Sequence, residues 1–135
     1  MKKEDKKLLL KDLCARFSYN CRVFYEYVDD LDGKTYGYSL TLNTWCIDEL
    51  VANKAVIKPY LRPMSSMTEE EKKELQEIAV ALSYNRDDIM IGAQINSFRQ
   101  LDGVLDSFNS HHLDWRGLIE RGLALEAPKG MYKIK

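Results

Sequence analysis

The sequence predicts one α+β domain, in which a small, largely antiparallel sheet built on a central hairpin packs against two or three helices. Two strand-like segments, residues 21–28 and 36–43, flank an Asp32-Gly33 pair, which is typical of a hairpin turn. Apolar residues recur at helical spacing over residues 3–17. This helix and a second one from Thr68 are expected to cover one face of the sheet.

Composition places the chain among ordinary globular proteins. Apolar residues make up 45% and charged residues 30% of the chain, which predicts one folded domain over residues 1–135. A net charge of −1 gives no overall basic field, so nucleic-acid binding is disfavoured. The apolar run Leu8 to Leu10 is too short for a signal peptide or a membrane span. Three cysteines without CxxC spacing fit reduced thiols, so we expect a cytoplasmic protein.

The helix predicted over residues 3–17 carries one apolar stripe that is expected to face the core. The residues of this stripe are Leu9, Leu10, Leu13, Cys14 and Phe17. Because Cys14 falls within the stripe, it is interpreted as a packed core thiol rather than a reactive nucleophile. The lysines and acidic residues between these positions are expected to form a solvated face.

The register of the hairpin follows if Asp32 and Gly33 are the central residues of a two-residue turn. The pairs are then Tyr27–Tyr38, Tyr25–Leu40 and Val23–Leu42. All of these side chains fall on one face, which we assign to the core, so the tyrosines are interpreted as core residues. Phe24 and Val28 lie on the opposite face and are expected to pack under another element rather than to form a contact patch.

The middle of the chain predicts a short helix over residues 45–53 and a brief strand over residues 55–58 that stops at Pro59. Thr68 begins the clearest helix of the sequence. Glu71, three residues later, completes a capping box, and the glutamates of the first turn complement the helix dipole.

The last third of the chain gives weaker signals. A strand is expected over residues 89–91 and a helix over residues 98–110. Asp114 is expected to cap a short helix that ends at Gly122 in a left-handed conformation. Residues 131–135 are expected to add an edge strand or to fray.

One cluster contains the side-chain types that catalysis or metal binding would need. It holds both histidines, a carboxylate, an indole and a guanidinium: His111, His112, Asp114, Trp115 and Arg116. A zinc site needs three or four converging ligands, and a catalytic histidine needs an orienting group and a pocket. The favoured interpretation is structural: a histidine and Asp114 cap helices, Trp115 packs, and Arg116 pairs with a carboxylate. No catalytic residue, metal or cofactor is therefore expected.

Two strings of the sequence carry a resemblance, namely KPYLRPMSSMTEEE at residues 58–71 and HHLDWRGLI at residues 111–119. With residues 6–16 and 122–127, they resemble a family of small uncharacterised proteins of Bacteroides-type gut bacteria, often prophage-associated. Where that family usually has Phe and Tyr in the second string, this chain has Leu113 and Trp115. The resemblance implies an intracellular protein of bacterial or phage origin, acting as an accessory factor on a host or phage protein.

These observations lead to three functional hypotheses. The first is a non-enzymatic, protein-binding accessory factor whose contact surface contains Arg62, His111, His112, Asp114, Trp115 and Arg116. The second is a small enzyme or metal-binding protein that uses His111, His112 and Asp114. The third is a single-stranded nucleic-acid binder that uses Arg22 and the hairpin tyrosines. The sequence leaves open the partner, the oligomeric state and whether the two motif segments meet in space.

Overall fold

The structure is a computed structural model that describes the backbone of residues 1–83 and 102–132. Side chains are described for residues 1–77 and 102–132. The strand predicted at residues 89–91, the first residues of the helix predicted over 98–110, and residues 133–135 lie outside this part of the chain.

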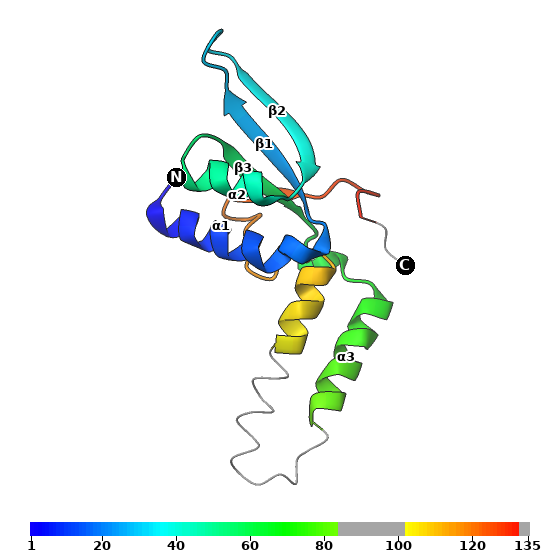
Figure 1. The fold of residues 1–135 in the computed structure, drawn as a ribbon. Helices are drawn as coiled ribbons and strands as arrows, with labels where there is room; N and C mark the ends of the chain where they lie inside the picture. Colours follow the sequence, from blue (N-terminus) through cyan, green and yellow to red (C-terminus); the bar gives the residue numbers. More distant parts are fainter. Residues whose placement is uncertain (84–101, 133–135) are drawn as a thin grey trace.

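Four strands form one sheet in the order β2-β1-β3-β4 (Figure 1). Their bounds are Arg22–Val28 for β1, Thr35–Thr41 for β2, Val56–Leu61 for β3 and Leu125–Glu126 for β4. β1 runs antiparallel to both β2 and β3, and only the short β4 pairs in parallel. The predicted α+β class, with a largely antiparallel sheet built on a hairpin, is therefore confirmed.

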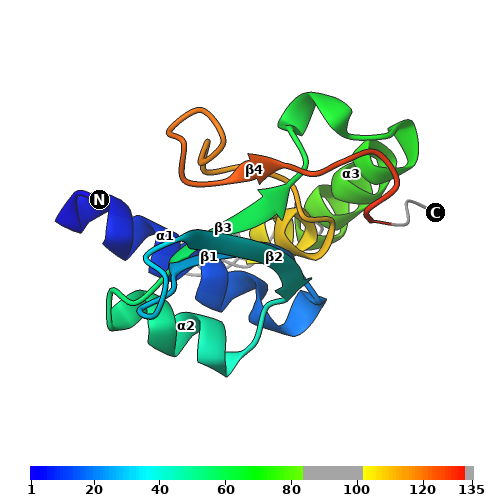
Figure 2. The same ribbon diagram turned by 90° about the horizontal axis from the view of Figure 1, so that it is seen from above.

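Two helices, α1 (Lys3–Arg16) and α2 (Thr44–Val51), lie against the sheet (Figure 2). α2 begins where the Asn43 side chain accepts a hydrogen bond from the Cys46 backbone N–H, which is an ordinary N-cap. The helices and strands share one buried core with the segment that precedes β4. Its most enclosed members are Leu9, Leu13, Cys21, Val23, Cys46, Ile57, Leu61 and Leu118.

The buried side of α1 differs from the predicted stripe. Leu9 and Leu13 are buried as expected, but the other buried residues of the helix are Asp12 and Arg16. These four positions share one helix face at spacings of three and four residues. Cys14 is exposed instead, so its interpretation as a core thiol is wrong. The ion pair between Arg16 Nε and Asp12 Oδ2, at 2.9 Å, is what makes a polar core face possible.

The hairpin forms as predicted, but its register is shifted by two residues. The observed pairs include Tyr25–Tyr38, Tyr27–Tyr36 and Val23–Leu40. The chain turns through residues 29–34 rather than through Asp32 and Gly33 alone. Asp29 N donates to Lys34 O at 2.8 Å across this loop, and Asp32 Oδ1 accepts from the Lys34 backbone N–H. A shift of two residues keeps each side chain on its predicted face, because strand side chains alternate with a period of two.

The helix predicted from Thr68, α3 (Glu69–Ser83), does not cover the sheet. It leads away from the end of β3 beside the helical residues 102–110 (Figure 1). The capping box is present, because Thr68 N donates to Glu71 Oε1 at 2.8 Å and Glu71 N donates to Thr68 Oγ1 at 3.1 Å. None of the described α3 residues belongs to the core. α1 and α2, rather than α1 and α3, cover the sheet.

Further differences concern the strands and the carboxyl-terminal segment. β3 continues through Pro59, which pairs with Val23, so the predicted stop at this proline is wrong. On its other side, β3 pairs with β4 only from Tyr60 onward, so Pro59 has no paired residue there. Prolines are tolerated at such unpaired edge positions of a strand.

The segment after Asp114 forms turns instead of a helix, with Gly122 left-handed at φ 75° as predicted. The short strand β4 is an edge strand of the sheet, and residues 131 and 132, the described part of the segment predicted to add a strand or fray, are not in a strand. The 3₁₀ turns η1 (Phe17–Tyr19) and η2 (Met64–Ser66) complete the described elements.

Candidate functional site

The two motif segments meet in space, at the end of β3. Arg62 N donates to His112 O at 2.7 Å, and Asp114 N donates to Arg62 O at 2.8 Å. Arg62 and Leu113 form an isolated parallel bridge between them. All six residues of the predicted contact surface therefore lie in or beside one junction, which ties together β3, α3 and the segment after residue 110.

Arg62 is the centre of this junction. Its Nη1 and Nη2 donate to the two carboxylate oxygens of Glu71, each at 2.7 Å, and both side chains are buried. Nη2 also donates to Ser66 O at 2.9 Å and Nη1 to His111 O at 3.2 Å. This hydrogen bonding lowers the pKa of Glu71 to about 2, so the buried pair is charged at neutral pH.

The two histidines have different surroundings. His111 is partly exposed, with Nδ1 3.1 Å from Glu71 Oε2 and Nε2 3.0 Å from Glu74 Oε2. His112 has a left-handed backbone, with φ 60°, and its ring stacks on Tyr132 at a centroid distance of 3.7 Å. Burial lowers the pKa of His112 to about 4, and its buried Nδ1 has no hydrogen-bond partner among the described residues. His112 is therefore a neutral packing residue at pH 7.

The remaining members of the cluster are also engaged. Asp114 accepts hydrogen bonds from the backbone N–H groups of Leu118 and Ile119, at 2.7 and 3.0 Å. Trp115 Nε1 donates to an asparagine side chain, and the Arg116 guanidinium lies 4.0 Å from the centre of the Trp115 ring. Arg116 Nη1 donates to the buried carboxylate of Asp12, in α1, at 2.7 Å. The predicted carboxylate pairing of Arg116 is confirmed. Asp114 accepts backbone hydrogen bonds as a cap would, but these belong to turns rather than to the predicted helix.

The geometry of this junction is that of a structural contact that holds separate segments of the chain together. Arg62 and Asp114 are buried, and the charged side chains of the cluster are paired or hydrogen-bonded. Among the described residues, no group of three His, Cys, Asp or Glu side chains is placed to hold a metal ion. Neither histidine lines the two surface hollows, of about 660 and 270 Å³, described for the chain. That a partner contacts this surface stays a prediction.

A second cluster, whose tyrosines the sequence analysis assigns to the core, lies on the hairpin and α2. We call it the aromatic face and define it as Tyr25, Tyr27, Tyr36, Tyr38 and Trp45. Tyr25 is its centre, with ring centroids 4.6 Å from Trp45, 5.3 Å from Tyr38 and 5.5 Å from Tyr27. Tyr27 in turn lies 5.9 Å from Tyr36. These spacings are those of attractive aromatic pairs.

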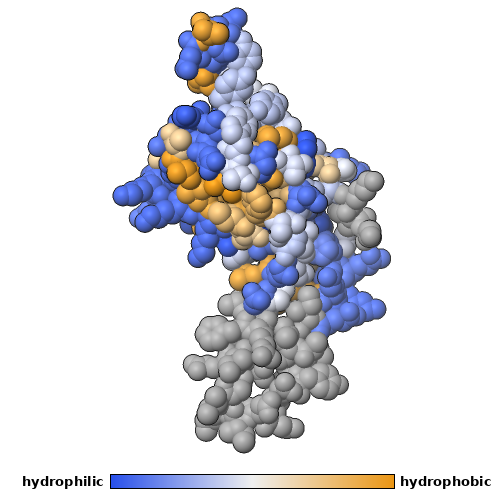
Figure 3. Space-filling model, viewed as in Figure 1, coloured by the Kyte–Doolittle hydropathy of each residue, from blue (hydrophilic) through white to orange (hydrophobic). Residues whose placement is uncertain are grey.

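Much of the aromatic face is open to solvent. Tyr25 is 4% exposed, but Tyr36, Tyr38 and Trp45 are 41%, 45% and 43% exposed. The interpretation of the hairpin tyrosines as core residues is therefore wrong for the two on β2. Both residues lie on β2, the edge strand of the sheet, and the turn end of the hairpin extends past α1 and α2 (Figure 1). In Figure 3 the tip of the hairpin is orange and blue, and a pale band of intermediate hydropathy runs below it.

The opposite face of the hairpin is also partly uncovered. Phe24 is half-buried and lies over Gly37, where an added Cβ would be 2.4 Å from the phenyl Cζ. The ring thus covers a position without a side chain. Val28 is 61% exposed, so the expectation that both residues pack under another element is wrong for Val28.

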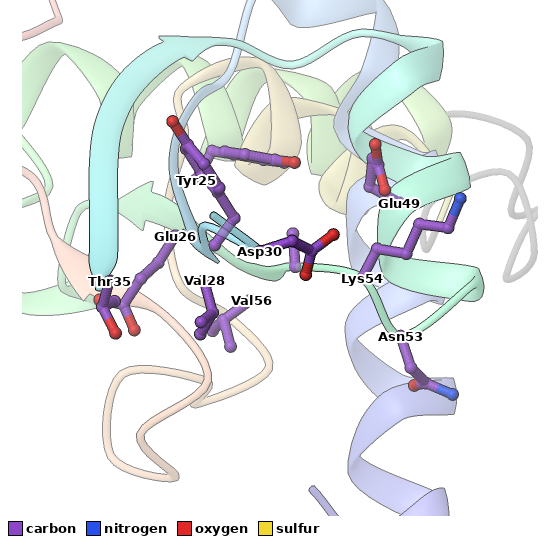
Figure 4. A pocket seen from close by; sticks show the side chains of 11 residues that line it. Tyr25, Glu26, Val28, Asp30, Thr35, Glu49, Asn53, Lys54 and Val56 are labelled. Atoms are coloured by element: carbon purple, nitrogen blue, oxygen red, sulfur yellow. The ribbon is translucent and has the colours of Figure 1, made fainter. Parts of the chain in front are cut away.

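A groove of about 660 Å³ opens at the foot of the aromatic face (Figure 4). It forms because β1 continues for two residues, Tyr27 and Val28, past its last pair with β3, between Glu26 and Val56. The end of α2 and the turn after it make the other wall. The polar and charged lining residues are Glu26, Asp30, Thr35, Glu49, Asn53 and Lys54.

Comparison with known proteins adds no relative from which a function could be transferred. No protein-family model, curated protein or solved structure matches this chain. In the part of the chain that the structure describes, no helix has the length and apolar character needed to cross a membrane. The assignment of function therefore depends on the geometry of the two clusters.

Proposed function

We propose that this chain is a non-enzymatic, protein-binding accessory factor that holds its partner on the aromatic face. The observation that carries the proposal is the exposure of Tyr36, Tyr38 and Trp45, between 41% and 45%, around the buried ring of Tyr25. Tyrosine and tryptophan are enriched at the energetic centres of protein interfaces. In line with the family resemblance, we place its action in the cytoplasm, on a protein of a bacterial host or its phage.

The strand that bears two of these tyrosines supports the same function. β2 is an edge strand of the sheet, and its seven residues, TYGYSLT, contain no charged residue and no proline. Charged residues and prolines normally protect an edge strand from pairing with another chain. An unprotected edge beside exposed rings suits an extended partner segment, because backbone pairing and side-chain contacts then act together.

The two alternative functions have weaker support. Stacking of nucleic-acid bases would use the same tyrosines, but the carboxylates of Glu26, Asp30 and Glu49 line the adjacent groove and would repel phosphates. An enzyme or metal protein would use the histidine cluster. His111 contacts two carboxylates, but His112 stacks on Tyr132 and Asp114 caps backbone N–H groups. A protein partner therefore accounts best for what is exposed.

Affinity capture from host cells, with and without phage induction, tests the proposal if it is done with matched variants. The test variant carries Tyr36→Ser and Tyr38→Ser, and the control carries Phe17→Ser and Met64→Ser. The control residues are 42% and 38% exposed, so similar apolar area is removed outside the aromatic face. We expect one protein to be retained by the wild type and the control but lost from the test variant. Equal retention by both variants would contradict the proposal.

A further inference from the structure

The groove beside the aromatic face has an unbalanced charge. Three carboxylates, from Glu26, Asp30 and Glu49, line it together with the single ammonium group of Lys54. No ion pair joins any of these three acids to a cation among the described residues. Elsewhere in the molecule, buried acids such as Asp12 and Glu71 have arginine partners. The groove therefore carries a local negative charge that the chain itself leaves uncompensated.

The apolar lining of the groove combines two tyrosine rings with the aliphatic residues Val28, Ala55 and Val56. Tyr25 and Tyr27 line it from β1, and the Glu49 carboxylate faces them from α2 (Figure 4). Burial, with the Glu49 charge as a further cause, raises the pKa of Tyr25. Tyrosine rings attract cations through their negative faces, and carboxylates accept charge-assisted hydrogen bonds.

These walls fit the side chain of lysine or arginine better than an anionic or an uncharged group. The aliphatic stem of such a side chain packs against tyrosine rings while its charged end meets the carboxylates. The groove also follows the edge of β1 beyond its last pair with β3, at Tyr27 and Val28, where an extended backbone has room to lie. An extended segment places every second side chain on one face.

We infer that the groove takes up an extended, basic segment of the partner protein, with a lysine or arginine side chain between the tyrosine rings and the three carboxylates. This inference rests on the proposed function and adds the chemistry of the partner to it. The aromatic face supplies the apolar contact area. The groove selects for positive charge.

Fluorescence anisotropy with defined peptides tests the inference on the full chain. The probe is a short labelled peptide in which arginine alternates with threonine, and its counterpart carries neutral citrulline in place of arginine. We expect the arginine peptide to bind at least about tenfold more tightly than the citrulline peptide at low ionic strength. Binding of the arginine peptide that is no stronger than that of the citrulline peptide would overturn the inference.

Matched variants locate the binding. The test variant carries Glu26→Gln, Asp30→Asn and Glu49→Gln, and the control, Glu4→Gln, Glu70→Gln and Glu120→Gln, changes the net charge equally at exposed positions away from the groove. We expect the test variant to lose about tenfold in affinity for the arginine peptide and the control to lose much less. Equal losses would reduce the effect to overall charge and overturn the inference.

Capture of the natural partner separates this inference from the proposed function. If the groove variant retains the partner as well as the wild type does, while the Tyr36→Ser, Tyr38→Ser variant loses it, the cationic segment is refuted and the aromatic face stands. If the groove variant and the tyrosine variant both lose the partner, and the groove control retains it, both proposals are supported. If the tyrosine variant retains the partner, the proposed function itself fails.

Discussion

At the scale of single residues, buried charged side chains link distant segments of the chain through hydrogen bonds and ion pairs. Arg62 connects β3 to α3 and to the segment around His111 through bonds to one carboxylate and two backbone carbonyls. Asp12 receives one guanidinium from its own helix and another from Arg116, far along the chain. Because these groups are buried, each depends on its partners for compensation.

The first prediction concerns the pair of Arg62 and Glu71. Arg62→Met would leave the Glu71 carboxylate buried without its cation, so we expect a loss of about 3–5 kcal/mol in the free energy of unfolding. Urea denaturation measures this loss. The control is Lys72→Met, because the ion pair of Lys72 with Glu69 is exposed to solvent and should contribute less than about 1 kcal/mol. Similar losses for the two variants would contradict a buried tie at Arg62.

The second prediction concerns His112 and pH. The pKa of His112 is lowered to about 4 in the folded chain, whereas an unfolded histidine titrates near its ordinary value of 6.5. Between these values the unfolded chain binds the proton and the folded chain does not, so stability should fall as pH falls through this window. His112→Asn removes the titration and keeps a residue that tolerates the left-handed backbone.

Urea denaturation of both proteins at pH 7 and pH 5 checks this expectation. The wild type should lose more free energy of unfolding than His112→Asn between the two pH values. The low pKa of Glu71, about 2, makes its own contribution mainly at more acidic pH. Identical losses for the two proteins would show that His112 titrates normally in the folded chain.

At the scale of elements, the hairpin is braced on both faces. Paired tyrosines stiffen one face, and on the other Phe24 lies over Gly37 on the neighbouring strand. An aromatic ring over a strand glycine is a known way to compensate for the missing side chain. This bracing keeps the exposed part of the hairpin in a defined shape, which lowers the entropic cost of binding a partner.

The third prediction tests this bracing. A Cβ at position 37 would meet the Phe24 ring at 2.4 Å, so Gly37→Ala should cost about 1–3 kcal/mol in the free energy of unfolding. In a Phe24→Ala background, the same change should cost much less, because the ring that it displaces is gone. Urea denaturation of the four proteins forms a double-mutant cycle. A coupling energy near zero would show that the ring does not rest on this glycine.

The elements also show what the sequence could predict. The faces of the hairpin follow from alternation, but the register does not, because a shift of two residues preserves both faces. The helix from Thr68 could be located through its capping box, but the local sequence does not indicate which part of the protein its apolar side contacts. In α1, the polar residues at the core face depend on Leu113 and Arg116, about a hundred positions away. Such long-range partners have no signal in the local pattern.

At the scale of the whole molecule, the two clusters lie at different ends of the sheet. The aromatic face is on the projecting hairpin, whereas the junction around Arg62 lies where β3 leads to α3 (Figure 1). The sequence singled out the junction because its residue types are conspicuous. The hairpin tyrosines are instead assigned to the core, because alternating tyrosines are typical of any half-buried sheet, and their exposure depends on the covering elements. The separation means that stability and binding should respond to different substitutions.

The central claim is that the partner binds the aromatic face, and the most direct test is a crossed comparison of purified variants with the captured partner. Isothermal titration measures the dissociation constant for Tyr38→Ser and for Trp115→Ser, a residue of the junction, after circular dichroism has shown that both are folded. We expect Tyr38→Ser to weaken binding by about tenfold or more and Trp115→Ser to leave it nearly unchanged. The reverse result, full binding by Tyr38→Ser and weak binding by Trp115→Ser, would move the contact surface to the junction and contradict the claim.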